Sequence, residues 1–377
     1  MPDIKLTNLI KKFGDVTAVD NLNVTIPDGS FFTLLGPSGC GKTTTLRMIA
    51  GLEKPTAGKI EIGKQLVFDS VTWTVVPPGK RNVGLVFQSY ALWPHMTVYD
   101  NISFPLRIQK LSRDQIQKKV DGVMNQVKIT GLEKRYPSEL SGGQQQRVAV
   151  ARELVTGVEV LSMDEPLGNL DAQLRLEMRT ELKRLHKATG QTILYVTHDQ
   201  LEAMTMSTHV AVMKDGLLQQ LSHPDDIYAS PANTFIAEFI GSLPINLFNV
   251  EVMEGIAYNN DLKLKLELPG KFKSINGKAI LGIRPENLSV VNNPTKTSVL
   301  GSVDSSLPAG SEVLIKVSVG EIGLNIKEKR GMNLEMDSTV HVDLDMEEAC
   351  FFDSITGNNL LTVPGAQQAT KKKATAQ

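Results

Sequence analysis

Apolar positions follow two different rhythms along this chain. Up to about residue 235, short apolar runs at 31–35, 158–163 and 192–197 have the length of buried strands. Between them lie stretches with helical spacing; in 172–189 one helical face carries Leu174, Met178, Leu182 and Leu185. Strands that alternate with helices predict an α/β domain built on a largely parallel sheet.

Other local patterns complete this part of the chain. We predict two strands around a turn at Phe13-Gly14 within 4–26, and one strand over 59–68. A hairpin is predicted about Asp215-Gly216. Helices are predicted over 43–51, over 112–134, from 142 to about 156, and in pieces over 224–239.

Helical spacing gives way to strict alternation near Gly241. Val313, Ile315, Val317 and Val319 alternate with other residues, and similar alternation occurs over 262–268 and 340–344. These patterns predict an all-β domain of roughly 120 residues, a small OB-like barrel. We therefore divide the chain into 1–240, 241–363 and a polar tail, 364–377, which we expect to be disordered.

Composition excludes several classes of protein. The chain has 377 residues, 41% of them hydrophobic and 21% charged, with a net charge of −1, so nothing favours a nucleic-acid partner. No apolar run is long enough to span a membrane, and residues 1–5 are too polar for a signal peptide. The two cysteines, Cys40 and Cys350, are expected as reduced thiols in a cytosolic protein.

The run GPSGCGKT at 36–43 matches the phosphate-binding P-loop, between a predicted strand and a predicted helix. Glycines let successive N–H groups point at an anion, and the helix N-terminus adds positive charge. Lys42 can reach the β- and γ-phosphates of a nucleotide, and the Thr43 hydroxyl can bind Mg²⁺. The alternative is a chance glycine-rich turn. The predicted nucleotide contacts are Gly36, Pro37, Ser38, Gly39, Cys40, Gly41, Lys42, Thr43 and Thr44.

Two carboxylates follow the predicted strand at 158–163. Asp164, at the end of a strand beside a P-loop, can hold Mg²⁺ through water. Glu165 is then placed to polarise an attacking water as a general base. The alternative is surface charge at a strand end.

The run LSGGQ at 140–144 is a third motif, in addition to the P-loop and the two carboxylates. With the P-loop, Gln88, DEP at 164–166, LD at 170–171 and His198, the chain resembles the ATP-binding cassette (ABC) ATPases over residues 4 to about 240. The resemblance implies an ATPase with a RecA-like core and a helical subdomain over about 89–157.

The resemblance also implies roles for single residues. Phe13 matches an aromatic that stacks on adenine, Gln88 a residue that touches Mg²⁺ and water, and His198 a residue that contacts the γ-phosphate. Without the resemblance, Phe13 could be an ordinary core residue, Gln88 would more often be a surface residue, and His198 would as often be a structural one. Glu165 remains the expected base.

In this family the LSGGQ run, called the signature, contacts the ATP that is bound by another copy of the cassette. Ser141 and Gly143 would cap the γ-phosphate across a head-to-tail dimer, and Asp171 would contact the partner subunit. A homodimer or a pairing with a related chain is implied. Two membrane permease subunits, contacted near Trp93, and a separate solute-binding protein are further implied partners.

Motifs in the second domain narrow the resemblance. GSLPIN at 241–246 and GIRPE at 282–286 are similar to carbohydrate importer ATPases of the maltose and glycerol-phosphate type, which carry a C-terminal β-barrel regulatory domain. Polyamine, ferric iron and sulfate importers share this layout, and 282–286 could also be a turn with an exposed Arg284–Glu286 pair. We expect a peripheral subunit at the cytoplasmic face of the membrane; a soluble non-transport cassette protein is the competing class.

Three residues depart from the family pattern. Ser162 interrupts an apolar strand, so its hydroxyl would need a partner if it is buried. Gly168 stands where a serine is frequent, which predicts a missing polar contact at the dimer-facing loop. Trp93 replaces a more usual Tyr or Phe.

Overall fold

The structure is a computed structural model that describes residues 2–259, 264–331, 334–361 and 363. Its contacts divide the chain into two compact units, Met1–Pro224 and Asp225–Gln377. We describe each unit by itself. The predicted disordered tail, 364–377, lies outside the described residues.

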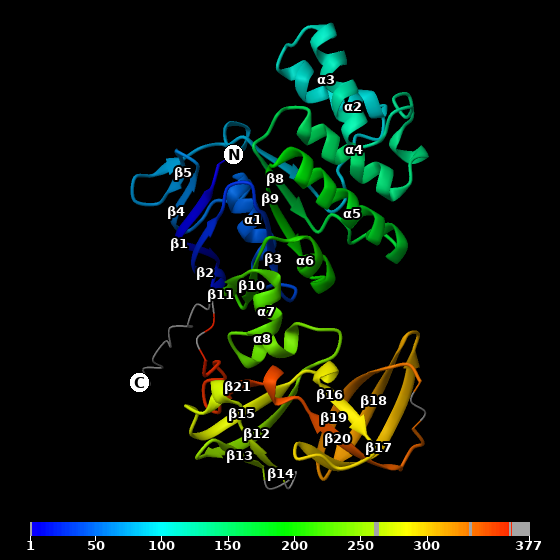
Figure 1. The fold of residues 1–377 in the computed structure, drawn as a ribbon. Helices are drawn as coiled ribbons and strands as arrows, with labels where there is room; N and C mark the ends of the chain where they lie inside the picture. Colours follow the sequence, from blue (N-terminus) through cyan, green and yellow to red (C-terminus); the bar gives the residue numbers. More distant parts are fainter. Residues whose placement is uncertain (1, 260–263, 332–333, 362, 364–377) are drawn as a thin grey trace. The chain divides into compact units, whose positions relative to one another are not determined.

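A six-stranded sheet in the order β11-β10-β3-β9-β8-β7 forms the centre of the first unit (Figure 1). Every ladder in it is parallel except that between β10 and β11. All residues of β3, β8 and β9 are buried, which explains their unbroken apolar runs. The α/β prediction is confirmed. The strands are β3 (Phe31–Leu35), β7 (Val83–Val86), β8 (Val160–Asp164), β9 (Thr192–Thr197), β10 (His209–Lys214) and β11 (Leu217–Ser222).

A second sheet of five antiparallel strands has the order β2-β1-β4-β5-β6. Our prediction of one strand over 59–68 is wrong, because a turn at Gly63, with a φ of +54°, divides it into two paired strands. Apolar residues occur on both sides of that turn, so the sequence pattern resembles that of one continuous strand. The strands are β1 (Ile4–Phe13), β2 (Val16–Ile26), β4 (Ala57–Ile62), β5 (Gln65–Asp69) and β6 (Thr74–Val75).

Helices pack on the central sheet, and three of them, α2, α3 and α4, lie together at one end of the first unit (Figure 1). We did not predict α2, and α3 is shorter than the predicted 112–134. Within the described ranges, no helix has the length and hydropathy that crossing a membrane requires. The helices are α1 (Lys42–Ala50), α2 (Val98–Ile108), α3 (Arg113–Gln126), α4 (Gly142–Leu154), α5 (Ala172–Thr189) and α6 (Gln200–Met206).

Two five-stranded antiparallel sheets build most of the second unit, in the orders β14-β13-β12-β15-β21 and β16-β20-β17-β18-β19. The all-β prediction is confirmed. The strands that we expected in one barrel are divided between two sheets, whose inner faces share one apolar core. The strands are β12 (Asn246–Met253), β13 (Ile256–Asn259), β14 (Leu264–Glu267), β15 (Gly277–Ile283), β16 (Leu288–Val291), β17 (Ser298–Ala309), β18 (Glu312–Val319), β19 (Ile322–Lys329), β20 (Thr339–Leu344) and β21 (Cys350–Asp353).

Two short helices, α7 (Pro224–Ala229) and α8 (Thr234–Phe239), which we expect at the end of the ATPase domain, make hydrogen bonds with this β structure. The Thr234 N–H donates to the Gly357 carbonyl at 2.9 Å. Arg284 donates to the Ile240 carbonyl at 2.7 Å and to the Tyr228 carbonyl at 2.7 Å. Arg284 is only 5% exposed, so the alternative of an exposed Arg284–Glu286 pair is wrong.

Candidate functional site

The predicted phosphate loop joins the carboxyl end of β3 to the first turn of α1. Gly39 and Gly41 have φ values of +80° and +98°, which glycine adopts without strain. A Cβ on Gly41 would lie 2.3 Å from the Ala18 carbonyl oxygen, so the loop also needs glycine for space. The N-terminal N–H groups of α1 therefore open onto a tightly curled loop, the geometry that binds an anion.

Lys42 is buried and folds back over this loop. Its Nζ donates to the carbonyls of Gly36 at 2.8 Å and Pro37 at 2.9 Å, and lies 3.7 Å from Cys40 Sγ. The ammonium group is thus held beside the N–H groups that would contact a phosphate. Burial raises the pKa of the Cys40 thiol, and Cys40 and Cys350 are both free and buried, as predicted for reduced thiols.

Thr43 and Asp164 meet although 121 residues separate them. The Thr43 hydroxyl donates to Asp164 Oδ1 at 2.7 Å, and Arg47 Nη2 lies 3.8 Å from Asp164 Oδ2. Burial raises the pKa of Asp164. We had not predicted Arg47, but its place four residues after Thr43 on the same helical face was a usable signal.

Glu165 and His198 form a second pair, at the ends of the adjacent strands β8 and β9. His198 Nδ1 lies 3.2 Å from Glu165 Oε2. Glu165 has a φ of +44°, which is uncommon for a residue with a side chain and costs of order 1–3 kcal/mol. Its N–H donates to the Val196 carbonyl at 2.9 Å. The neighbouring strand thus holds Glu165 in a strained conformation that directs it toward His198.

Gln88 follows β7 and lies against the loop after Glu165. Its carbonyl accepts a hydrogen bond from Asn169 Nδ2 at 3.0 Å. A Cβ on Gly168 would lie 3.3 Å from Gln88 Nε2. A serine at this position would therefore crowd the Gln88 amide, whereas glycine leaves space beside it within this chain.

Phe13 ends β1 with its ring 48% exposed, which excludes the alternative of a core residue. Lys11 Nζ lies 4.5 Å from the ring centroid. Lys11 is held by Glu53 Oε1 at 2.6 Å and the Lys54 carbonyl at 2.9 Å. The aromatic ring thus has a fixed cation on one side, and Lys11 is a contact we had not predicted.

The residues expected to face a partner subunit lie where α4 and α5 begin. Ser141 caps α4, and Asp171 caps α5 by accepting from the Leu174 N–H at 2.9 Å. A Cβ on Gly143 would lie 2.9 Å from Leu174 Cδ1, so this glycine also permits the two helices to pack closely. Across the described residues, no hydrogen bond or ion pair joins this group to the loop at 36–43.

The segment that contains Trp93 is rigidly supported. Asn101, fully buried, accepts from the Trp93 N–H at 2.9 Å and donates to the carbonyls of Trp93, Met96 and Thr97. The Trp93 ring packs on Phe104, with centroids 4.6 Å apart, and under the Arg152 guanidinium at 4.9 Å.

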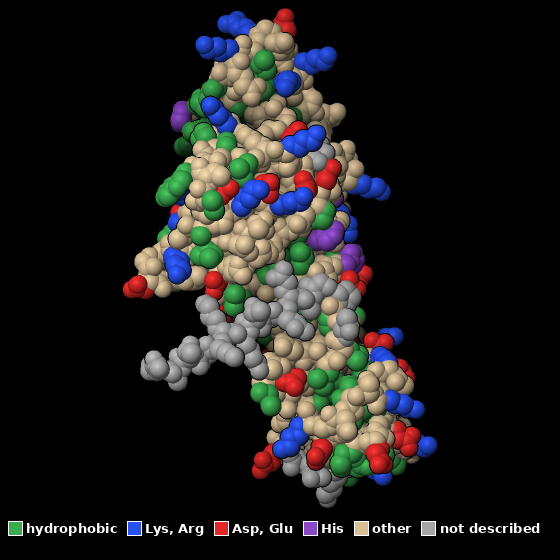
Figure 2. Space-filling model, turned by 90° about the vertical axis from the view of Figure 1, so that its left-hand side faces the viewer, with side chains coloured by type: hydrophobic (Ala, Val, Ile, Leu, Met, Phe, Trp, Pro, Cys, Tyr) green, Lys and Arg blue, Asp and Glu red, His purple; other side chains and the backbone are tan. Residues whose placement is uncertain are grey.

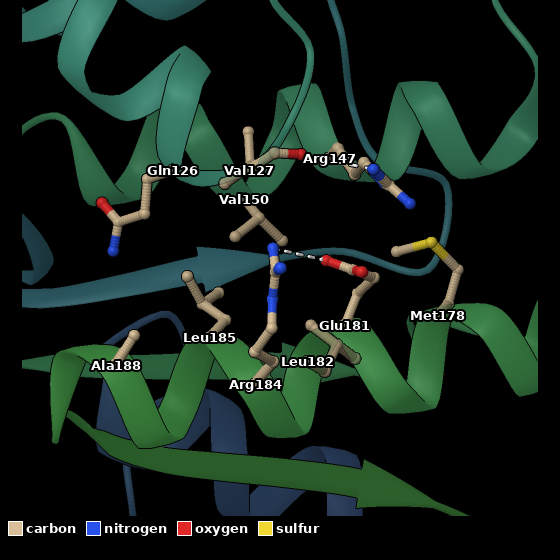
Figure 3. A pocket seen from close by; sticks show the side chains of 10 residues that line it. All are labelled: Gln126, Val127, Arg147, Val150, Met178, Glu181, Leu182, Arg184, Leu185 and Ala188. Carbon is tan, nitrogen blue, oxygen red and sulfur yellow. Dashed lines mark hydrogen bonds and ion pairs between the residues drawn. The ribbon is translucent and has the colours of Figure 1, made fainter.

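A pocket of about 380 Å³ separates the middle of α4 from α5 (Figure 3). Its lining is mostly apolar, and Glu181 at its edge bonds to Lys128 and Arg184 at 3.0 Å each. The residues lining the pocket are Gln126, Val127, Arg147, Val150, Met178, Glu181, Leu182, Arg184, Leu185 and Ala188.

On the face drawn in Figure 2, basic and acidic side chains are interspersed.

The sheet, the phosphate loop and the acidic strand end define a P-loop nucleoside triphosphatase. A family profile described as "ABC transporter" matches residues 19–168. The chain is 46% identical over 368 residues to the trehalose/maltose import ATP-binding protein of Thermococcus litoralis, covering 95% of this chain and 99% of that protein. The chain belongs to the ABC transporter family, among its ATP-hydrolysing import subunits.

Two further comparisons agree. The spermidine/putrescine import ATP-binding protein of Rubrobacter xylanophilus is 48% identical over 292 residues, or 76% of each chain. A dimeric ATP-binding cassette solved in a post-hydrolysis state with ADP and Pi has a TM-score of 0.51 and 31% identity, over 59% of this chain and 98% of that one. The predicted ABC ATPase fold is therefore confirmed.

Proposed function

We propose that Thr43, Asp164 and Gln88 form the Mg²⁺ site of this ATPase. The Thr43 hydroxyl and Asp164 carboxylate are 2.7 Å apart, directly after the phosphate loop and at the end of β8. Hydroxyl, carboxylate and amide oxygens are the donors that Mg²⁺ prefers. When bound, the ion supplies positive charge to the triphosphate. Lys42 contributes further charge, and the exposed ring of Phe13 stacks on adenine.

In this proposal Glu165 is the general base and His198 contacts the γ-phosphate. The observation that carries the proposal is the 3.2 Å pair of Glu165 and His198, reached by a strained backbone beside the Thr43–Asp164 pair. The Glu165 carboxylate orients a water and accepts its proton as the water attacks the γ-phosphorus, and the bond from that phosphorus to the bridging oxygen of ADP breaks, which releases ADP. The remaining residues position the triphosphate and balance its charge, which is most of what phosphoryl transfer requires.

We further propose that the site is completed by a second copy of the chain. Ser141 and Gly143 at the start of α4, with Asp171 at the start of α5, would face ATP on the partner's phosphate loop. Two observations support this arrangement: this group bonds to none of the described phosphate-loop residues, and the similar solved cassette is a dimer. ATP binding then closes the dimer, and hydrolysis reopens it.

The subunit is proposed to drive uptake of a sugar, acting at the cytoplasmic face of the membrane with two permease subunits and an external solute-binding protein. The trehalose/maltose relative aligns over 99% of its length, whereas the polyamine relative aligns over 76%. Polyamine, ferric iron or sulfate import by the same machine is the second candidate. Uptake assays with sugars, spermidine, ferric iron and sulfate, in cells lacking and then regaining this chain, distinguish the two.

Glu165→Gln tests the assignment of the base. The amide keeps the size of the side chain but accepts no proton, so we expect turnover to fall at least about 100-fold while ATP affinity changes little. The variant should accumulate as an ATP-bound dimer, visible by size-exclusion chromatography with light scattering. Glu177→Gln, an exposed carboxylate on α5, is the matched control. Hydrolysis at the wild-type rate in Glu165→Gln would remove Glu165 as the base.

A mixing experiment tests the composite site. Lys42→Ala disables the phosphate loop and Ser141→Arg disables the signature, so each variant alone should be inactive. A mixed dimer restores one intact site, with the loop from one chain and the signature from the other. We expect ATP-dependent dimerisation or ATPase activity to return on mixing. Recovery of neither would mean either that the loop and the signature do not work across chains or that both sites are needed together.

A further inference from the structure

Glu202, on α6, is a buried carboxylate that the proposed reaction does not use. It is 3% exposed, and its Oε2 accepts hydrogen bonds from the Tyr195 hydroxyl at 2.8 Å and the Thr197 hydroxyl at 2.7 Å. Both donors lie on β9, the strand that ends immediately before His198. Burying a carboxylate is costly, so a site that retains one with two directed hydroxyl donors calls for an explanation.

The bonds of Glu202 belong to a closed circuit. The Thr197 hydroxyl donates to Glu202, and the same oxygen accepts from the Asp199 N–H at 2.9 Å. The Glu202 N–H in turn donates to Asp199 Oδ1 at 3.1 Å. The residues on either side of His198 are therefore tied to each other directly, by the bond from the Asp199 N–H to the Thr197 hydroxyl, and a second time through Glu202.

His198 lies inside this circuit but directs its side chain elsewhere. Its ring is 57% exposed, and its Nδ1 meets Glu165 at 3.2 Å. Hydrogen bonds on both flanking residues restrain the His198 backbone, which favours the position in which the ring meets Glu165. Arg175, 3.7 Å from Asp199 Oδ2, secures the same turn from α5.

We infer that Glu202 is a positioning residue, which acts on ATP hydrolysis only by holding His198 in place. The inference rests on the proposed role of His198. It predicts that removing Glu202 lowers kcat without weakening ATP binding, since neither Glu202 nor its circuit contacts the phosphate loop among the described residues. If Glu202 were purely structural, its removal would instead lower the stability of the protein and the amount of active protein, whether or not His198 is present.

A double-mutant cycle on the full-length chain tests this directly. We expect His198→Ala to lower kcat about 100-fold and Glu202→Ala about tenfold, with the Kd for ATP changed less than about twofold. If Glu202 acts only through His198, the double variant should match His198→Ala within about twofold. Independent effects would multiply to about 1,000-fold and would overturn the inference. If His198→Ala alone leaves kcat unchanged, the proposed function of His198 fails instead.

Two milder variants keep the test valid if Glu202→Ala folds poorly. Glu202→Gln retains an oxygen that can accept from both hydroxyls, so kcat should stay within about threefold of wild type. Thr197→Val keeps the shape of the side chain but breaks the circuit, and should lower kcat about as much as Glu202→Ala. Glu177→Ala, on the neighbouring helix, should change nothing. A large loss of ATP affinity in Thr197→Val, or wild-type kcat in that variant, would contradict a positioning role.

Discussion

Ser162 shows at the scale of one residue that a break in an apolar pattern can mark a local cost. It is fully buried in β8, and its hydroxyl is among the described polar groups without a hydrogen-bond partner. Such a hydroxyl costs about 1–3 kcal/mol. We expect Ser162→Ala to raise the free energy of unfolding by about 1 kcal/mol, measured by urea denaturation.

Ser30→Ala is the control for that change. Ser30 is also buried, but its hydroxyl donates to the Pro27 carbonyl at 2.6 Å. Its removal should lower the free energy of unfolding by about 1 kcal/mol, because the shorter of the two hydrogen bonds to that carbonyl is lost. Destabilisation of both variants by equal amounts would mean that the Ser162 hydroxyl is satisfied.

Glu202 yields a prediction on pH at the same scale. Burial raises the pKa of Glu202 in the folded chain above its unfolded value, which is about 4.3. A raised folded pKa contributes stability that is full below the unfolded pKa and is lost as pH rises through the folded pKa. Compared with Glu202→Gln, which cannot titrate, the wild type should therefore lose stability from about pH 4.5 upward. Urea denaturation of both chains from pH 4.5 to 8 measures this. A stability of the wild type, relative to Glu202→Gln, that stays constant or rises with pH contradicts the prediction.

Arg81 connects elements that are distant in the sequence. It is 2% exposed, and its guanidinium donates to the Met48 and Ile49 carbonyls at the end of α1 and to the Val76 carbonyl, at 2.8, 3.0 and 2.8 Å. The helix that begins at the phosphate loop is thus capped at its other end. We expect Arg81→Met to lower the free energy of unfolding by about 2–4 kcal/mol, measured by urea denaturation. The exposed neighbour Lys80→Met should change it by less than about 0.5 kcal/mol; equal effects would refute the capping role.

Local signals decide which elements can be predicted from the sequence. Helix α5 was predicted at its observed bounds, because it has a regular apolar face, an N-cap at Asp171 and a C-cap at Gly190. Helix α2 was missed: it contains Pro105, and the N–H groups of Val98 and Tyr99 bond to the carbonyls of Arg135 and Glu133. Those partners are distant in the sequence, so no local pattern indicates them.

The same distinction applies to the candidate site. The phosphate loop and the acidic strand end were visible because each is a short motif with its own chemistry. Lys11 and Arg81 were missed because their roles depend on contacts with distant residues. For Glu202 a local signal did exist, since its spacing from Asp199 is that of an N-cap and the third helical residue.

At the scale of the whole molecule, the position of the domain boundary can be tested. Ala237 on α8 packs with Ile245, Cys350 and Phe352 of the second unit. A chain ending at residue 240 would keep α7 and α8 but lose the strands that cover them. A chain ending at 223 would lose the helices together with their partners, in line with the division at Pro224.

We therefore expect the chain 1–223 to be monodisperse and to bind ATP. The chain 1–240 should expose apolar surface, with stronger binding of the dye 8-anilino-1-naphthalenesulfonate and aggregation at lower concentration. Light scattering, dye fluorescence and ATP titration of both chains, beside the full-length protein, measure these differences. The opposite result, a well-behaved 1–240 and an unfolded 1–223, would assign α7 and α8 to the ATPase fold, as the sequence pattern first indicated. The reason for expecting otherwise is physical: an apolar helix face is stable only when the surface that covers it is present.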